Sequence, residues 1–225
     1  MVPTPPEWRG RAELTGYWFL DRSADWQPPA QLEAFLRDGT PAVYAGFGSM
    51  TMKNPDVALD AIVTAVERVD CRAVISAGWA GLQPQRISNC IDATNDMPHD
   101  WLFPRMASIV HHGGAGTSAA ALRAGRPSVV IPFFSDQPFW GRWLERIGAT
   151  AKPLPIKRLS ADELAKAIDL TLTSRTLREA AEGLGTRIRQ EDGVARAAEL
   201  VEQAALHRAH TPRRPVSIRP AHVEA

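Results

Sequence analysis

Two neighbouring histidines and a run of glycines lie between two apolar stretches of this chain. Residues 108–110 form a short apolar run, His111-His112 follow, and residues 113–116 (Gly-Gly-Ala-Gly) lead through Thr117 into a stretch rich in alanine and leucine. A strand, a glycine loop and a helix in this order direct backbone N–H groups and the positive end of a helix dipole at an anion. The pattern therefore predicts a diphosphate site whose backbone donors include Gly114 and Gly116.

A carboxylate and a carboxamide follow the next apolar run. Residues 129–131 are apolar, and the run leads to Asp136-Gln137-Pro138. A carboxylate and a carboxamide together accept hydrogen bonds from hydroxyl groups and donate to them. We expect Asp136 and Gln137 to lie close to the diphosphate site and to contact a polar part of the same ligand.

The same residues also fit a second class of site. Gly114-x-Gly116-x-x-Ala119 matches the dinucleotide fingerprint, and Asp136 stands about 20 residues further on, the place of a ribose-binding acid. Two observations weigh against a nicotinamide enzyme. The fingerprint usually opens a domain, whereas a long α/β-like stretch precedes it here, and Asp136 is followed at once by Gln137-Pro138 and a helical pattern. NAD binding that is lost in Asp136→Ala would identify such an enzyme.

The composition argues against several kinds of partner. The formal net charge of +1 gives no reason to expect nucleic acid or an anionic membrane. Cys71 and Cys90 are too few for a disulfide framework, so we expect a reduced, cytoplasmic setting and chemically inert thiols. No apolar run approaches the roughly 18 residues that span a bilayer, and residues 1–10 lack the features of a signal peptide. Any contact with a membrane is expected to be peripheral.

Strand and helix patterns alternate along the chain. Strands are predicted over residues 41–47, 72–76, 87–93, 108–110, 129–131 and 149–154. Helices are predicted near residues 31–37, over 56–69, after the glycine loop, over 139–147, from the capping box Ser160-x-x-Glu163 to about 172, over 174–190 and over 194–206. This alternation predicts an α/β fold, a Rossmann-like parallel sheet with helices on both faces.

The chain is expected to divide into three segments: an extended lead-in over residues 1–40, one domain over 41–206, and a disordered tail over 207–225 that is rich in Arg, His and Pro.

In a parallel sheet, ligands bind beyond the carboxyl ends of the strands, where the strand order reverses. Gly48-Ser49, Gly78-Trp79, residues 112–117 and residues 134–137 each follow a predicted strand. Four such loops predict a single cleft.

The ordered set of motifs resembles the carboxyl-terminal half of a GT-B glycosyltransferase of family 1. The similarity is greatest to sterol 3-beta-glucosyltransferases and related bacterial antibiotic glycosyltransferases, and it runs from about Pro3 to Leu206. It rests on five stretches: GYWFL at 16–20, GFGSM at 46–50, PHDWLFPR at 98–105, HHGGAGT at 111–117 and PFFSDQPFWG at 132–141. The resemblance implies a domain that binds a sugar-nucleotide donor, most often a UDP-sugar.

The resemblance also assigns roles to individual residues. His112, Thr117 and, from the opposite loop, Ser49 hold the diphosphate, and Asp136 and Gln137 contact the sugar hydroxyls. Met97 and His99 lie against the uracil, and Trp79 is a candidate stacking surface for it. No metal and no cofactor are implied, because a helix N-terminus and an imidazole can stabilise the leaving UDP in an inverting transfer. The implied acceptor is a lipophilic hydroxyl compound such as a sterol, glycolipid or natural product, and the implied sugar is glucose.

Two departures separate the chain from the plant members of the family. The plant enzymes carry a ribose-binding Glu where Ala120 stands, and a uracil-stacking Trp near the position of Asp96. Base and ribose recognition is therefore expected to differ from the plant pattern.

The family's catalytic base belongs to an amino-terminal domain, and this chain begins at what resembles the interdomain linker. We expect no catalytic residue in the chain and little or no transferase activity from it alone. A non-catalytic nucleotide-sugar-binding fragment or auxiliary subunit is the alternative.

Several prominent side chains have simpler interpretations. His111 is expected to pack or hydrogen-bond locally, and Asp100 to cap a short helix. Trp101, Phe103 and Trp140 are expected in the core or in the wall of the cleft, and one of Phe133 and Phe134 in the core.

Overall fold

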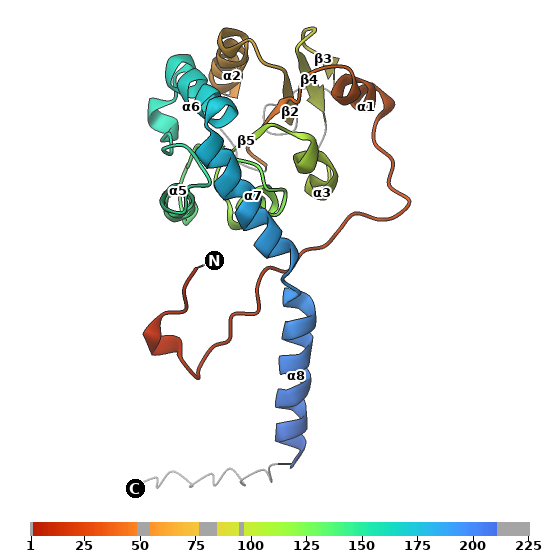
Figure 1. The fold of residues 1–225 in the computed structure, drawn as a ribbon, viewed down its shortest axis with the longest axis vertical. Coiled ribbons are helices and arrows are strands. Elements are labelled where there is room, and N and C mark those ends of the chain that lie inside the picture. The colour runs from red at the N-terminus through yellow and green to blue at the C-terminus, as the bar shows by residue number, and fades with distance from the viewer. Residues whose placement is uncertain (1, 49–54, 77–84, 95–96, 211–225) are drawn as a thin grey trace, which may run out of the picture. The chain divides into compact units, whose positions relative to one another are not determined.

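One six-stranded sheet organises the chain (Figure 1). The computed structural model describes residues 2–48, 55–76, 85–94 and 97–210. Within them the strand order is β3-β4-β2-β1-β5-β6, parallel throughout except for the antiparallel pairing of β3 with β4. The strands are β1 (Val43–Gly46), β2 (Ala73–Ser76), β3 (Gln85–Arg86), β4 (Ile91–Thr94), β5 (Ser108–His111) and β6 (Ser128–Val130).

Helices connect the strands and cover both faces of the sheet. They are α1 (Ala30–Arg37), α2 (Pro55–Val69), α3 (His99–Leu102), α4 (Ala115–Arg123), α5 (Gln137–Arg146), α6 (Ala161–Thr173), α7 (Arg175–Arg189) and α8 (Gly193–His210). Short 3-10 turns lie at Pro6–Trp8, Phe103–Arg105 and Ile156–Arg158. The α/β fold with helices on both faces is thus the one that the sequence predicts.

Two hydrophobic clusters fill the space on either side of the sheet. On one face, Ile62 and Val66 of α2 and Leu164 of α6 pack against strand residues such as Val110. On the other face, Leu32 and Phe35 of α1, Trp101 of α3 and Ala121 of α4 pack against Tyr44, Val74 and Ile109. Because both faces of the central strands are covered, every residue of β1 and β2 is buried, and all but Ser76 are nonpolar or aromatic.

Caps fix the ends of several helices near the positions read from the sequence. Ser160 accepts a hydrogen bond from the backbone N–H of Glu163 at 3.3 Å and starts α6. Ser174 follows the end of α6 and is also the N-cap of α7, because its hydroxyl group accepts a hydrogen bond from the backbone N–H of Leu177. Gly148 follows α5 with φ of 75° and ends it as expected.

One predicted strand, 149–154, is wrong. Thr150 forms only an isolated bridge to Ser128, although the N–H of Leu154 still reaches the carbonyl of Val130 at 2.9 Å. Pro153 and Pro155 lack the N–H groups that a continuous ladder requires, so the segment follows the sheet edge without joining it. The strand predicted over 87–93 is displaced, because β4 covers Ile91–Thr94 and residues 87–90 form the turn from β3.

The described residues fall into two compact units. One joins residues of Met1–Phe19 to residues of Glu191–Ala225, and the other is Leu20–Gln190. In the first unit α8 continues to His210, four residues beyond the predicted helix end, and the predicted disorder beyond residue 210 lies outside the described residues. The sequence instead places the domain boundaries at residues 40 and 206. All residues of the candidate site for which the structure gives a position belong to the second unit.

Candidate donor-nucleotide site

The point at which the strand order reverses lies between β1 and β5. From β1 the chain moves outward through β2 to β4, and then returns to the other side of β1 to form β5 and β6. The last residues of the two central strands, Gly46 and His111, are paired in the sheet. In a sheet of this order, the connections on the two sides of the reversal point turn to opposite faces, so a ligand crevice is expected at this edge.

The backbone turn after β5 is held by His111. The backbone N–H of Gly113 donates to Nδ1 of His111 at 3.1 Å. Gly113 has φ of 85°, and a Cβ placed there would lie 2.7 Å from Cγ1 of Val130, so only glycine fits. Burial, reinforced by His112 and His99, lowers the pKa of His111 to about 3, so the ring is neutral. The expectation that His111 hydrogen-bonds locally is confirmed.

The N-terminus of α4 faces the crevice without a side-chain cap. Gly114 occupies the N-cap position and has no side chain to donate or accept. The first backbone N–H of the helix that donates to a carbonyl is that of Ser118, which donates to the carbonyl oxygen of Gly114 at 2.9 Å. Gly116 is exposed, and a Cβ there would meet open space. The free N–H groups and the positive end of the helix dipole therefore favour an anion at this end of α4. The diphosphate contacts of Gly114 and Gly116 stay a prediction.

The imidazole of His112 crosses the crevice. A Cβ at Gly114 would overlap its Nε2, and a Cβ at Gly48 would lie 3.5 Å from its Cε1, so the ring lies between the loops after β1 and β5. Burial lowers the pKa of His112, and the nearby Asp136 carboxylate opposes this. Nδ1 is buried and has no hydrogen-bond partner among the described residues. A neutral imidazole in this place can donate a hydrogen bond to an anion at the end of α4.

The loop after β6 brings Asp136 and Gln137 beside the glycine turn. A Cβ at Gly113 would lie 3.3 Å from the Gln137 carbonyl oxygen and 3.7 Å from its Cβ. Asp136 is exposed, and its carboxylate accepts a hydrogen bond from the Trp140 indole N–H at 2.9 Å. Ser135, directly before it, has φ of 59°, a left-handed conformation that a non-glycine residue adopts at a cost. Asp136 is therefore held at the mouth of the crevice by its neighbours.

Gln137 has a more internal position than the sequence suggests. Its side chain is only 4% exposed, and Oε1 accepts hydrogen bonds from the backbone N–H groups of Phe133 at 2.8 Å and Phe134 at 3.3 Å. The carboxamide oxygen thus shapes the loop that presents Asp136. The predicted contact of Gln137 with a ligand stays a prediction.

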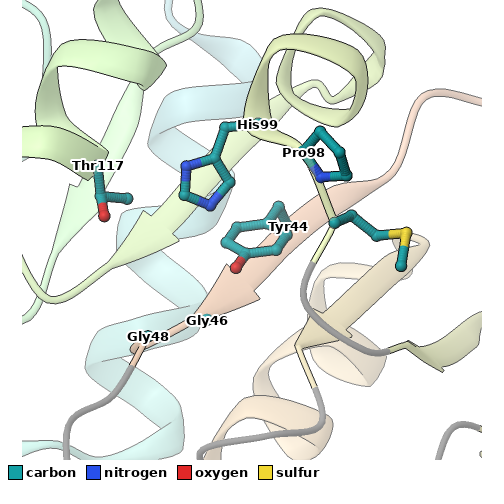
Figure 2. Close-up of a pocket in the computed structure, with 7 residues that line it drawn as sticks. Tyr44, Gly46, Gly48, Pro98, His99 and Thr117 are labelled. Atoms are coloured by element: carbon teal, nitrogen blue, oxygen red, sulfur yellow. The ribbon is translucent and has the colours of Figure 1, made fainter. Parts of the chain in front are cut away.

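A cavity of about 370 Å³ continues the crevice toward α3. Figure 2 shows the His99 imidazole and the Tyr44 phenol side by side, with Thr117 on one side and Pro98 on the other. The His99 ring stacks on Phe103 with centroids 4.1 Å apart and rings 16° from parallel. The Tyr44 and His99 rings are T-shaped to each other, with centroids 6.3 Å apart. The lining residues are Tyr44, Gly46, Gly48, Met97, Pro98, His99 and Thr117. A flat heteroaromatic group would find planar and apolar walls here.

The structure brings three predicted residues, Met97, His99 and Thr117, to this cavity and adds Tyr44, which the sequence alone does not assign to the site. In the sequence Tyr44 belongs to an apolar strand typical of a core. The only available signal is Gly46 two residues later, on the same face of β1. A Cβ at Gly46 would overlap the Tyr44 hydroxyl, so the phenol extends across the glycine toward the strand end.

Other predicted residues lie elsewhere or outside the described residues. Ser49, Trp79 and Asp96 are outside the described residues. Asp100 does not cap α3 with its side chain but accepts hydrogen bonds from Arg22. Trp101, Phe103 and Phe133 pack in or against the core as expected, whereas Phe134 is 61% exposed. Ala120 is half-buried and packs against the α1–α3–α4 cluster.

Two further findings concern the whole described part of the chain. Among residues 2–48, 55–76, 85–94 and 97–210, no group of three or more His, Cys, Asp or Glu side chains could hold a metal ion. No helix within these residues has the length and apolarity needed to cross a bilayer.

The strand order, with its glycine loop at the reversal point, defines a Rossmann-like domain. Residues 60–203 match the family described as "Erythromycin biosynthesis protein CIII-like, C-terminal domain". The chain belongs to this glycosyltransferase family, and the resemblance to GT-B enzymes is confirmed.

Comparison with individual proteins gives the same family and fold. The chain is 39% identical over 199 residues to the sterol 3-beta-glucosyltransferase UGT80A2 of Arabidopsis thaliana, covering 87% of the chain and 31% of that protein. The chain thus spans less than a third of that relative's length.

Two solved glycosyltransferases share the fold. VinC in complex with dTDP is 25% identical, with a TM-score of 0.62 over 76% of this chain and 44% of VinC. UDP-glucose: anthocyanidin 3-O-glucosyltransferase in complex with UDP is 17% identical, with a TM-score of 0.69 over 82% of this chain and 45% of that one.

Proposed function

We propose that this chain is the donor-binding half of an inverting glycosyltransferase. It would bind a UDP-sugar from which a hexose is transferred to a hydroxyl group of a lipophilic acceptor. The observation that supports this most strongly is the position of His112. Its imidazole lies between the loop after β1 and the uncapped N-terminus of α4, where a diphosphate would meet both the ring and the free N–H groups.

The proposed chemistry of the chain is stabilisation of the leaving group. As the sugar departs, negative charge grows on the diphosphate oxygens. The α4 N–H groups, the Thr117 hydroxyl and the imidazole of His112 are preorganised donors for that charge, and each such donor is typically worth a few kcal/mol in the transition state. Asp136 would hold sugar hydroxyls from the mouth of the crevice.

The cavity lined by Tyr44, Met97 and His99 would take the base. UDP and dTDP, the nucleotides in the two structural relatives, both carry a pyrimidine. Glucose and a sterol or similar acceptor are proposed from the similarity to the sterol 3-beta-glucosyltransferase.

The chain is expected to bind donor without transferring it. Three histidines near the site are committed to other contacts. His111 is fully buried and bonded to Gly113, His112 lies at the end of α4, and His99 is stacked on Phe103. None of them is placed to deprotonate an acceptor hydroxyl group.

The nicotinamide alternative fits the topology poorly. A dinucleotide fingerprint occupies the first strand-to-helix turn of its sheet, whereas this glycine loop follows β5, the fourth parallel strand along the chain. Asp136 lies in an exposed loop beside a tryptophan rather than at the end of a strand next to the loop.

Calorimetric titration of the purified chain with UDP, UDP-glucose, dTDP and NAD tests the proposal. UDP and UDP-glucose are expected to bind in the micromolar to millimolar range and NAD to give no saturable heat. Binding of NAD in preference to the UDP compounds, or binding of none of them by a chain that circular dichroism shows to be folded, would overturn it.

A further inference from the structure

A strap of chain before α1 binds both helices that wall the candidate site. Asp21 and Arg22 are neighbours in sequence, in a segment without regular secondary structure. Asp21 forms a bidentate pair with Arg123 at the end of α4, in which Nη2 and Oδ2 are 3.2 Å apart. Arg22 pairs with Asp100 in the first turn of α3, with Nη1 and Oδ2 2.6 Å apart. Two consecutive residues thus hold two different helices.

The four charges alternate and act on one another. The hydrogen bond from Arg123 is the main cause that lowers the pKa of Asp21, and Arg22 adds to it. The pKa of Arg123 is raised mainly by Asp21 and further by Asp100. Each charge therefore has an opposite charge on a second element nearby. A single ion pair at the surface adds little to the stability of the folded state, whereas a network of several charges with good geometry adds more.

The partner on the helix is partly shielded in each ion pair, and a second anchor lies close by. The Asp100 and Arg123 side chains are 18% and 30% exposed. Four residues after Arg22, the Trp26 indole lies against Trp101 of α3 with ring centroids 5.2 Å apart. The strap is therefore attached to α3 by a charge pair and by an aromatic contact.

The two helices carry opposite sides of the site. α3 follows directly on Met97 and Pro98 and begins at His99, which line the cavity, whereas α4 begins at the glycine loop and carries Thr117. The strap therefore links the helix that begins at the cavity wall to the C-terminal end of the helix whose N-terminus faces the site.

We propose that Asp21, Arg22, Asp100 and Arg123 form an ionic brace that positions the base-binding side of the site relative to the diphosphate-binding side. The proposal rests on the function proposed above, and it adds positioning residues outside the ligand contacts. A ligand that spans both sides depends on the brace. A ligand that contacts only the end of α4 does not.

The test compares UDP with inorganic pyrophosphate. The double variant Asp21→Asn/Arg22→Gln removes both of the strap's charges and keeps polar side chains at the two positions. We expect its affinity for UDP to fall about fivefold, as loss of two coupled pairs implies, while its affinity for pyrophosphate stays within about twofold of the parent. Glu179→Gln, which removes the exposed Arg175–Glu179 pair of α7, is the matched control and should change neither affinity.

A second measurement separates this proposal from the proposed function. Hydrogen exchange of the ligand-free chain should be faster in the double variant for the hydrogen-bonded amides of residues 101–102 and 118–124, and unchanged in α2 and α6. Equal losses of affinity for UDP and pyrophosphate, or unchanged exchange in those two segments, would overturn the brace. If the parent chain binds neither ligand, the proposed function fails, and the exchange pattern still decides whether the brace positions the two helices.

Discussion

Two adjacent histidines at the end of β5 have different roles because their side chains point in different directions. His111 is the last residue of the strand and faces inward, whereas His112 lies just beyond it and reaches across the crevice. The motif predicts a diphosphate loop and a local role for His111, and both follow from the chemistry of glycine and imidazole. The sequence does not show that the His111 ring faces the core and is fully buried, whereas the His112 ring faces the crevice and is only partly buried.

The burial of His111 should make the protein sensitive to acid. Its pKa is about 3 in the folded chain, against 6.5 for a histidine in an unstructured peptide, so the unfolded chain binds this proton first and stability is lost as the pH falls below 6.5. Between pH 7 and pH 5 this residue alone should cost about 2 kcal/mol.

His111→Asn keeps an acceptor for Gly113 and removes the titration. Urea unfolding at the two pH values should show a loss that is about 2 kcal/mol smaller in this variant than in the parent. The same pH dependence in both chains would contradict the assignment of His111 as a neutral, buried ring.

Residue types alone do not predict how Tyr44 and Gln137 are used. Tyr44 is identified with the cavity only when Gly46 is seen to leave room for its hydroxyl group. Gln137 looks like a ligand-reading amide, yet its oxygen is occupied by two backbone N–H groups of its own loop. Both outcomes depend on the backbone path near the side chain, which residue type does not determine.

At the scale of elements, strands and helices are predicted well where periodicity and capping agree. α2 and α6 are predicted from apolar spacing and the Ser160 cap, and β1 and β2 from short, largely apolar runs that are buried on both faces. The strand predicted over 149–154 does not form because Pro153, and Pro155 directly after it, interrupt the ladder. The order of the strands, which creates the crevice between β1 and β5, comes from long-range pairing that local patterns do not contain.

The N-cap of α6 offers a direct measure of what one capping hydroxyl group contributes. α6 packs on α2 and the core, so loss of its first turn should lower the stability of the whole unit. Ser160→Ala removes the acceptor for the N–H of Glu163 and is expected to cost about 1 kcal/mol in urea unfolding.

Ser160→Asp restores an acceptor at the same place and should return stability to within a few tenths of a kcal/mol of the parent. If Ser160→Ala unfolds at the same urea concentration as the parent, the hydroxyl group is not the effective cap.

At the scale of the whole molecule, the site is assembled from segments far apart in sequence. The loop after β1, the turn before α3, the N-terminus of α4 and the loop before α5 meet at one sheet edge. The strap at residues 21–22 holds α3 and α4 from the outside. A nucleotide that bridges these elements should therefore depend on the fold as a whole more than a small anion does.

The most direct test is the affinity of UDP for the parent chain and for His112→Ala, measured by calorimetry on samples of equal folded fraction. Because the imidazole is proposed to lie against the diphosphate, the variant should bind UDP at least about tenfold more weakly. Cys90→Ser, at an exposed position in the turn before β4, is the control and should bind like the parent. Equal affinity of His112→Ala and the parent would mean that the diphosphate does not lie between His112 and the end of α4.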